Sequence, residues 1–215
     1  DSFNDEYSEI KNNKIKNNSY LYKYNVMMTE FNDFVDAEVL YPVSKRYKNT
    51  VDEELRVGFD NMYKNINFPQ RFVNNLLQLK FTNSFIEISR FTINTTLGFF
   101  GFKDVRKHVF NLERKNEDFG QTLGYYNIGS GAHIVLPLLG PSNVRDIVGL
   151  SFDYLVVPNA TFDDSTVEIT SKVFKTVNNK SLNLEVYNNL KKDAITLQPY
   201  LESVYEDYRN KQIKE

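Results

Sequence analysis

Glycine is concentrated in one window near the middle of the chain. Seven of the nine glycines lie between Gly98 and Gly140, and the helical spacing of apolar residues fails across this window. Glycine lets the backbone adopt positive φ and lets two segments approach closely. We therefore expect a shaped, closely packed loop here instead of a long regular element, and loops of this kind often carry function.

Helical patterns precede the glycine-rich window. From Leu21, apolar residues recur at three- and four-residue steps, which predicts a helix that ends near Pro42. A second pattern covers 55–66, and Pro69 then stands in the first turn of a third helix. Residues 85–97, expected to be capped by Thr82 or Asn83, are apolar around more than half of the helix. Such a helix is either buried or faces lipid.

Helices also follow the window. Ser142 or Asn143 can cap a helix that runs to about Val156, and helical patterns resume at Asp164, with Pro199 dividing the last two. The predicted fold class is mainly α, a single domain of amphipathic helices with one glycine-rich loop or hairpin insert. The residues of the capped helix that we expect to face inward are Val144, Ile147, Val148 and Leu155.

Composition limits the function classes. The chain has 215 residues, a formal net charge of −2 and no cysteine. Its dispersed Lys and Arg do not indicate nucleic-acid binding, and no stretch approaches the ~20 apolar residues of a membrane-spanning helix. Residues 1–20 are rich in Asn and charge, so we expect a polar tether there and one domain over 21–215.

One serine and one histidine invite a catalytic interpretation. Ser130 is followed by His133, but a nucleophile elbow needs glycine two residues before and after the serine, where Ile128 and Ala132 stand. A phospholipase that uses Ser130 and His133 is therefore disfavoured, and a tight turn accounts for Ser130 better. We expect no enzyme activity, no cofactor and no metal site.

Three motifs stand in order in and after the window. They are EDFGQTLG from Glu117, then Gly129-Ser130-Gly131, then LPLLGPSNVRD ending at Asp146. In length and order they resemble the signature of the MlaA (VacJ) family of outer-membrane lipid-trafficking proteins, and the likeness extends over about 20–155. The residues to which we assign a structural role in this signature are Asp118, Phe119, Gly120, Gly140, Pro141, Arg145 and Asp146.

The resemblance implies a ring-like helical body in the inner leaflet of the Gram-negative outer membrane, on its periplasmic side, with an amphipathic channel. It implies phospholipid transport that maintains lipid asymmetry: misplaced phospholipids leave the outer leaflet and pass to a periplasmic carrier, MlaC. Many members associate with trimeric porins, and most are lipoproteins anchored through an N-terminal Cys. We expect residues 1–20 to have followed such a cysteine, which this chain does not contain.

The glycine-rich loop is our candidate for the channel and its gate, with one residue of the first helix opposite it. The alternative is a non-transporting peripheral scaffold associated with porins, whose apolar surfaces serve only docking. The residues predicted to contact lipid are Met28, Tyr125, Tyr126, Ile128, Gly129, Ser130, Gly131, Ile134, Val135, Leu136, Leu138 and Leu139.

Overall fold

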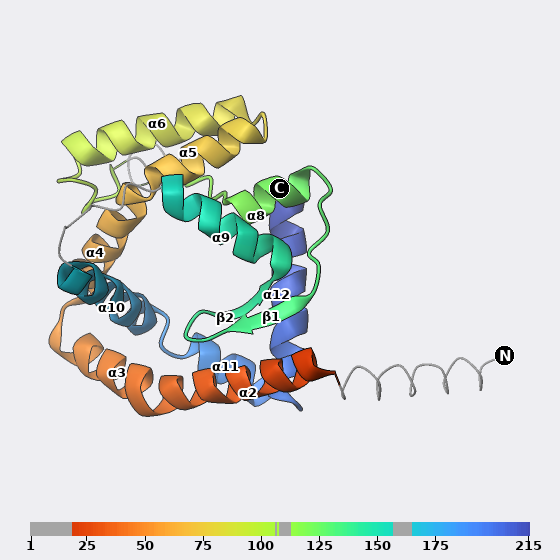
Figure 1. The fold of residues 1–215 in the computed structure, drawn as a ribbon. Helices are drawn as coiled ribbons and strands as arrows, with labels where there is room; N and C mark the ends of the chain where they lie inside the picture. Colours follow the sequence, from red (N-terminus) through yellow and green to blue (C-terminus); the bar gives the residue numbers. More distant parts are fainter. Residues whose placement is uncertain (1–18, 106, 108–112, 157–164) are drawn as a thin grey trace.

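Helices arranged in a ring make up most of the molecule (Figure 1). The computed structural model describes residues 19–105, 107, 113–156 and 165–215. The predicted tether, except for its last two residues, and Pro158, which was expected to end a helix, lie outside the described residues. The mainly α fold class with a ring-like body and a glycine-rich hairpin insert is confirmed.

The elements do not follow chain order around the ring, because the helix over 165–182 packs against those over 41–50 and 53–66. A two-stranded hairpin reaches into the opening of the ring (Figure 1). In chain order the elements are α2 (Tyr20–Val35), the π-helical turn η1 (Asp36–Leu40), α3 (Tyr41–Thr50), α4 (Glu53–Ile66), α5 (Phe68–Leu77), α6 (Phe81–Thr96), α8 (Phe119–Tyr125), β1 (His133–Leu136), β2 (Gly140–Asn143), α9 (Val144–Val156), α10 (Ser165–Leu182), α11 (Val186–Asp193) and α12 (Leu197–Lys214).

The sequence predicted that the first helix ends near Pro42, but the chain stays helical beyond this residue. α2 gives way to the π-helical turn η1, and α3 then carries Pro42 in its first turn. Proline lacks the N–H that would bond back into the preceding turn, and the π-helical turn stands directly before it, where the regular α-helical bonding is already interrupted. The chain therefore stays helical up to Thr50 and forms one long side of the ring (Figure 1).

Other helix boundaries agree with the sequence in part. Pro69 stands in the first turn of α5, as predicted, and the Oδ1 of Asn143 accepts a hydrogen bond from the Asp146 N–H at the start of α9. The predicted caps of α6 were wrong, because α6 begins earlier, at Phe81, without a side-chain cap. Pro199 lies in the first turn of α12 and does not separate two helices.

Apolar side chains of the helices are largely exposed, and polar ones are buried. In α9 the buried residues are Arg145, Asp146, Gly149 and Asp153, whereas Leu155 is 81% exposed. The prediction for this helix was therefore wrong: Val144, Val148 and Leu155 are exposed, and Ile147 is half-buried. Periodicity identifies an apolar face but does not say whether that face meets the protein core or another apolar medium.

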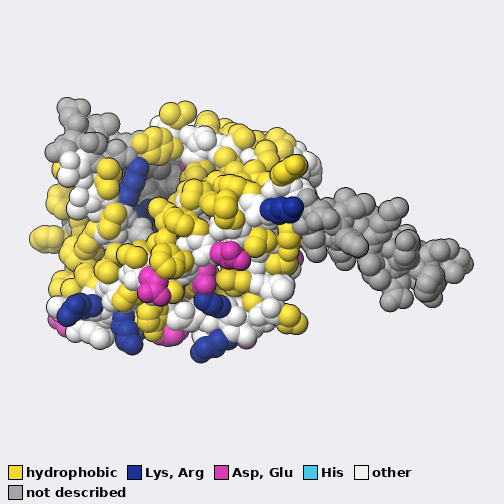
Figure 2. Space-filling model, turned by 60° about the horizontal axis from the view of Figure 1, so that its bottom comes forward, with side chains coloured by type: hydrophobic (Ala, Val, Ile, Leu, Met, Phe, Trp, Pro, Cys, Tyr) yellow, Lys and Arg dark blue, Asp and Glu magenta, His cyan; other side chains and the backbone are white. Residues whose placement is uncertain are grey.

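The same reversal occurs in α6. Phe85 is 72% exposed, and the buried side chains are Ser84, Glu87, Arg90 and Asn94. Figure 2 shows hydrophobic side chains over much of one face of the molecule, with most of the visible charged side chains in its lower half. Within the described residues, no helix combines the length and the apolar character that crossing a membrane would require.

Polar side chains in the interior hold the helices to one another. Arg71 of α5 donates from its Nε to the Oε2 of Glu87 on α6 over 2.6 Å, and Glu87 Oε1 accepts from the N–H of Lys115 over 2.8 Å. A buried charge is tolerated only when it is paired and hydrogen-bonded, which is the case here. The interior is thus connected by directional bonds, which fix the ring's geometry.

Candidate functional site

The β-hairpin is the element that the ring surrounds (Figure 1). Its strands pair antiparallel, from His133 with Asn143 to Leu136 with Gly140. In the turn Leu138 has φ 64°, and Gly140 has φ 84°. A leucine at positive φ is strained by roughly 1 kcal/mol. The apolar side chain of Leu138 is 66% exposed at the tip.

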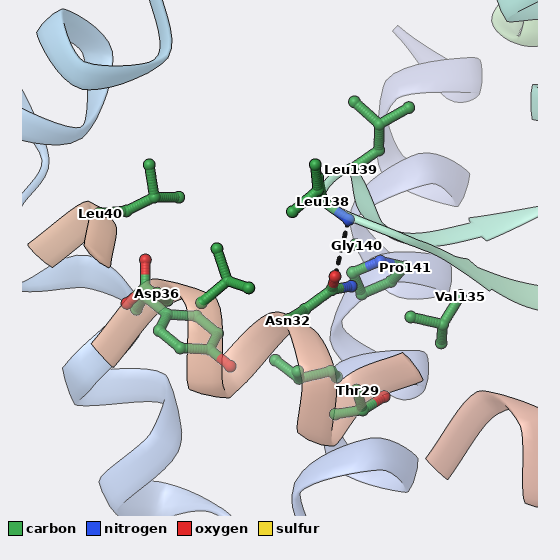
Figure 3. Close-up of a pocket in the computed structure, with 12 residues that line it drawn as sticks. Thr29, Asn32, Asp36, Leu40, Val135, Leu138, Leu139, Gly140 and Pro141 are labelled. Carbon is green, nitrogen blue, oxygen red and sulfur yellow. Dashed lines mark hydrogen bonds between the residues drawn. The ribbon is translucent and has the colours of Figure 1, made fainter. Parts of the chain in front are cut away.

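Two asparagines of α2 hold the free edge of β1. Asn25 donates from its Nδ2 to the carbonyl of His133 and accepts from the N–H of Val135, both over 2.9 Å. Asn32 donates to the carbonyl of Leu136 over 2.9 Å and accepts from the N–H of Leu138 over 2.7 Å (Figure 3). The two asparagines are seven residues apart, which is two helical turns, so they lie on one face. Each side-chain amide makes the donor and acceptor hydrogen bonds that a neighbouring strand would otherwise make.

A cavity of about 240 Å³ lies between α2, η1 and the tip of the hairpin (Figure 3). Its wall combines polar groups of Thr29, Asn32 and Asp36 with the apolar side chains of Leu40 and Leu138. A wall of this composition can accommodate a molecule that has both polar and apolar parts.

Two further cavities border the hairpin. One, of about 620 Å³, lies against α10 and α11, and the other, of about 430 Å³, lies against α8, α9 and α12. Leu139 lines all three cavities. A small movement of the tip would therefore change the shape of all three spaces at once.

Buried charges fix the base of the hairpin. Arg209 of α12 donates to Asp118 over 2.7 and 2.8 Å and to Asp146 over 2.9 and 3.0 Å. Asp146 also accepts from Arg145 and from the hydroxyl of Tyr205. Burial alone would raise the pKa of Asp146, but these donors outweigh it and hold the pKa below its usual value.

α8 and α9 approach closely next to these charges. A Cβ added to Gly149 would overlap the backbone of Gly120, and a Cβ added to Gly120 would overlap the carboxylate of Asp146. The rings of Phe119 and Phe152 stack with centroids 3.8 Å apart. Asp118 caps α8 by accepting from the N–H of Gln121 over 2.8 Å. Glycine at both crossing positions lets the two helices and the carboxylates share this space.

Asp153 of α9 is a buried carboxylate with only neutral hydrogen-bond donors. It accepts from the amides of Gln70 and Asn74 and from the N–H of Phe119, over 2.8 to 3.1 Å. Burial raises the pKa of Asp153 to about 6, and the hydrogen bonds oppose this shift only in part. Within the described part of the chain, no group of three or more side chains is placed to hold a metal ion.

The structure brings part of the predicted lipid-contacting set together. Val135, Leu136, Leu138 and Leu139 line the cavities described above. The others lie away from these three cavities, and the hydroxyl of Tyr126 donates to the carbonyl of Leu77 over 2.6 Å. Contact with lipid stays a prediction for both groups. This second group consists of Met28, Tyr125, Tyr126, Ile128, Gly129, Ser130, Gly131 and Ile134.

The residues assigned a structural role lie at the two ends of the hairpin. Asp118, Arg145 and Asp146 meet at its base, whereas Gly140 and Pro141 belong to β2 and line the cavity at the tip. The sequence reasoning missed Asn32 and the cavity-lining residues of α10. For the asparagine a signal existed, because its spacing of seven from Asn25 places two amides on one helical face.

These observations define a class of mainly α proteins in which amphipathic helices form a ring, with polar faces inward, around a β-hairpin. The chain belongs to the MlaA lipoprotein family, whose family model matches residues 18–212.

Relatives and a solved structure agree with this assignment. An uncharacterized protein of Rickettsia bellii is 31% identical over 83% of this chain and 69% of its own length. The intermembrane phospholipid transport system lipoprotein MlaA of Haemophilus influenzae is 33% identical over 63% of this chain, and that of Escherichia coli is 32% identical over 57%. The chain spans 55% and 50% of these two relatives, about half their length.

The solved chain comes from work on the structural basis for maintenance of bacterial outer membrane lipid asymmetry. It superposes with a TM-score of 0.74 and 28% identity, over 89% of this chain and 95% of that chain.

Proposed function

We propose that this protein moves phospholipid out of the outer leaflet of the outer membrane and passes it to a periplasmic carrier of the MlaC type, which maintains lipid asymmetry. The interior of the ring is the path, and the hairpin tip is its gate. The names of the H. influenzae and E. coli relatives, which are phospholipid transport lipoproteins, support this role. It needs no bond to change, so no enzyme activity is proposed.

The observation that carries the proposal is the reversed distribution of polar and apolar side chains. Exposed apolar faces such as that of α6 are stable in the acyl-chain region of a membrane leaflet, where the ring can lie without spanning the bilayer. The interior in turn offers polar groups to a headgroup and apolar groups of the tip to the tails. Sheltering the tails matters, because each exposed methylene costs about 0.8 kcal/mol.

The hairpin suits a gate because only its base is fixed by buried charges. Its tip is held by the amide of Asn32, and Leu139 borders all three cavities. Gly131, with φ 72°, lies between this base and the preceding loop, where an added Cβ would approach Val144 to 3.1 Å. A side chain at Gly131 should therefore press on Val144 at the start of α9 and alter the path of the hairpin.

A transfer assay tests the proposal with Gly131→Val. Labelled phospholipid is supplied in vesicles with an MlaC-type carrier as acceptor, and Ala132→Val, at an exposed neighbouring position, is the matched control. We expect Gly131→Val to slow transfer at unchanged far-UV circular dichroism and Ala132→Val to leave it unchanged. Equal transfer by both variants would contradict the role of the hairpin as a gate.

The exposed apolar faces also suit a second function, a scaffold that docks to a porin and moves no lipid. Mass spectrometry of lipids retained by the purified protein separates the two, because a scaffold would retain none in its interior. Anchorage through a lipidated cysteine outside this chain is likewise a proposal, and the mass of the native protein tests it.

A further inference from the structure

One face of α10 is turned to the ring interior and carries lysines. This face lines the cavity of about 620 Å³ that also meets the hairpin tip. Its residues follow one another at three- and four-residue steps, which is the spacing of a single helical face. They are Lys172, Lys175, Thr176, Asn179 and Lys180, and Asn183 lines the cavity just after the end of the helix.

The charge on this face is only partly compensated. The Nζ of Lys180 pairs with Asp36 over 2.6 Å, and the Nζ of Lys172 lies 5.4 Å from the centroid of the Tyr154 ring. Among the described residues, Lys175 has no ion-pair partner, and no Asp or Glu lines this cavity. The cavity therefore keeps a positive charge at neutral pH.

The wall opposite the lysines is apolar. It consists of Leu139 at the hairpin tip and of Val186 and Leu190 of α11. A free phosphate ion would use only the cationic wall. A phospholipid has a phosphate and acyl chains that match the two walls, and a lysine ammonium is a common phosphate binder.

We propose that Lys175, with Lys172 and the polar groups of Thr176 and Asn179, binds the phosphate of a phospholipid headgroup inside the ring. The acyl chains lie against Leu139 and the apolar side chains of α11. This site favours lipids of net negative charge over zwitterionic ones, since the latter bring their own cation. The inference rests on the proposed function and adds to it a headgroup preference.

Lipid retention measures this preference directly. The full chain in detergent is incubated with vesicles of equal phosphatidylglycerol and phosphatidylcholine, and mass spectrometry gives the ratio of the two lipids that co-purify. We expect the ratio to exceed one and to fall about fivefold for each lysine removed, in Lys175→Gln and then in Lys172→Gln/Lys175→Gln. Lys175→Arg should keep it, and so should Lys192→Gln, at a residue outside the cavity.

Each outcome decides one part of the proposal. A ratio of one in the unsubstituted chain, or an unchanged ratio in both glutamine variants, overturns the headgroup site and leaves transport standing. No retained phospholipid in any variant overturns the proposed function itself. In ³¹P NMR we expect inorganic phosphate alone to show no saturable binding; saturable binding that Lys175→Gln abolishes would assign the site to a soluble phosphate instead.

Discussion

The base and the tip of the hairpin are held by different kinds of interaction. At the base, Arg209 bridges Asp118 and Asp146 in a buried setting, and α8 and α9 touch at glycine. At the tip, Leu138 is exposed and is held by a single amide of α2. Charged hydrogen bonds to buried groups are strong and costly to break, whereas neutral ones contribute about 1 kcal/mol. This difference suits an element that stays anchored while its end moves.

Arg209→Met should have the largest effect, because it leaves the carboxylates of Asp118 and Asp146 without their shared cation. We expect a loss of about 4 kcal/mol in the free energy of unfolding, measured by chemical denaturation in detergent. Lys211→Met, at an exposed position of the same helix, is the control and should change stability by less than about 0.5 kcal/mol. Similar stabilities for the two variants would contradict a base held by charge.

Acidification should affect Asp153 and Asp146 in opposite directions. The folded-state pKa of Asp153 is about 6 against an ordinary 3.8, so the cost of its charge is present above pH 6 and is relieved as the pH falls toward 3.8. This gain is on the order of 3 kcal/mol. The pKa of Asp146 is lowered, so its stabilising contribution is lost only below about pH 3.8.

Asp153→Asn tests this prediction. The free energy of unfolding is measured from pH 7 to pH 4 for the variant and for the unsubstituted chain, and only the latter should gain stability in that range from residue 153. If the free energy of unfolding changes with pH in the same way in both proteins, residue 153 is not the source of the expected gain.

Gly149→Ala should cost about 2 kcal/mol, since its Cβ would overlap the backbone of Gly120 and push α9 from α8. Gly129→Ala is the matched control, because no atom lies within 4 Å of the added Cβ. Thermal denaturation of both variants measures the difference. Equal melting temperatures would mean that the base tolerates a wider helix spacing than its contacts suggest.

Asn32→Ala should have the smallest effect on stability, about 1 kcal/mol, but the most localised effect on dynamics. We expect faster hydrogen exchange at the N–H of Leu138 and unchanged exchange at the base. Asn32→Asp keeps the acceptor for Leu138 and loses only the donor to Leu136, so it should protect the Leu138 N–H better than Ala does. Equal exchange at Leu138 in all three proteins would show that Asn32 does not hold the hairpin tip.

The sequence predicted what local rules determine. Pro69 at a helix start and Asn143 as a cap follow from backbone chemistry within a few residues, and both occur. The glycine window likewise predicted a shaped loop, and it contains the short helix α8 and most of the hairpin. Features that depend on local backbone chemistry can therefore be predicted without knowing what surrounds the helices.

What the sequence could not predict depends on surroundings or on distant partners. Leu155 is 81% exposed, although the periodicity of its helix predicted an inward side chain, because periodicity does not say which medium an apolar face meets. Arg209 lies 63 residues from Asp146 and 91 from Asp118, beyond the stretch of about 20–155 over which the sequence was seen to resemble the family. In the sequence, the cavity lysines of α10 look like an ordinary charged helix face, and only the folded ring shows that they line a cavity.

The gate is tested most directly by fixing the tip. Because the chain has no cysteine, Val35→Cys and Leu138→Cys, whose parent residues line the same cavity, can be bridged selectively by a short reducible cross-linker. Either single variant treated with the same reagent is the control. We predict that the bridge stops transfer of labelled phospholipid to the carrier and that reduction restores it. Transfer at the unbridged rate by fully bridged protein would contradict a moving hairpin tip.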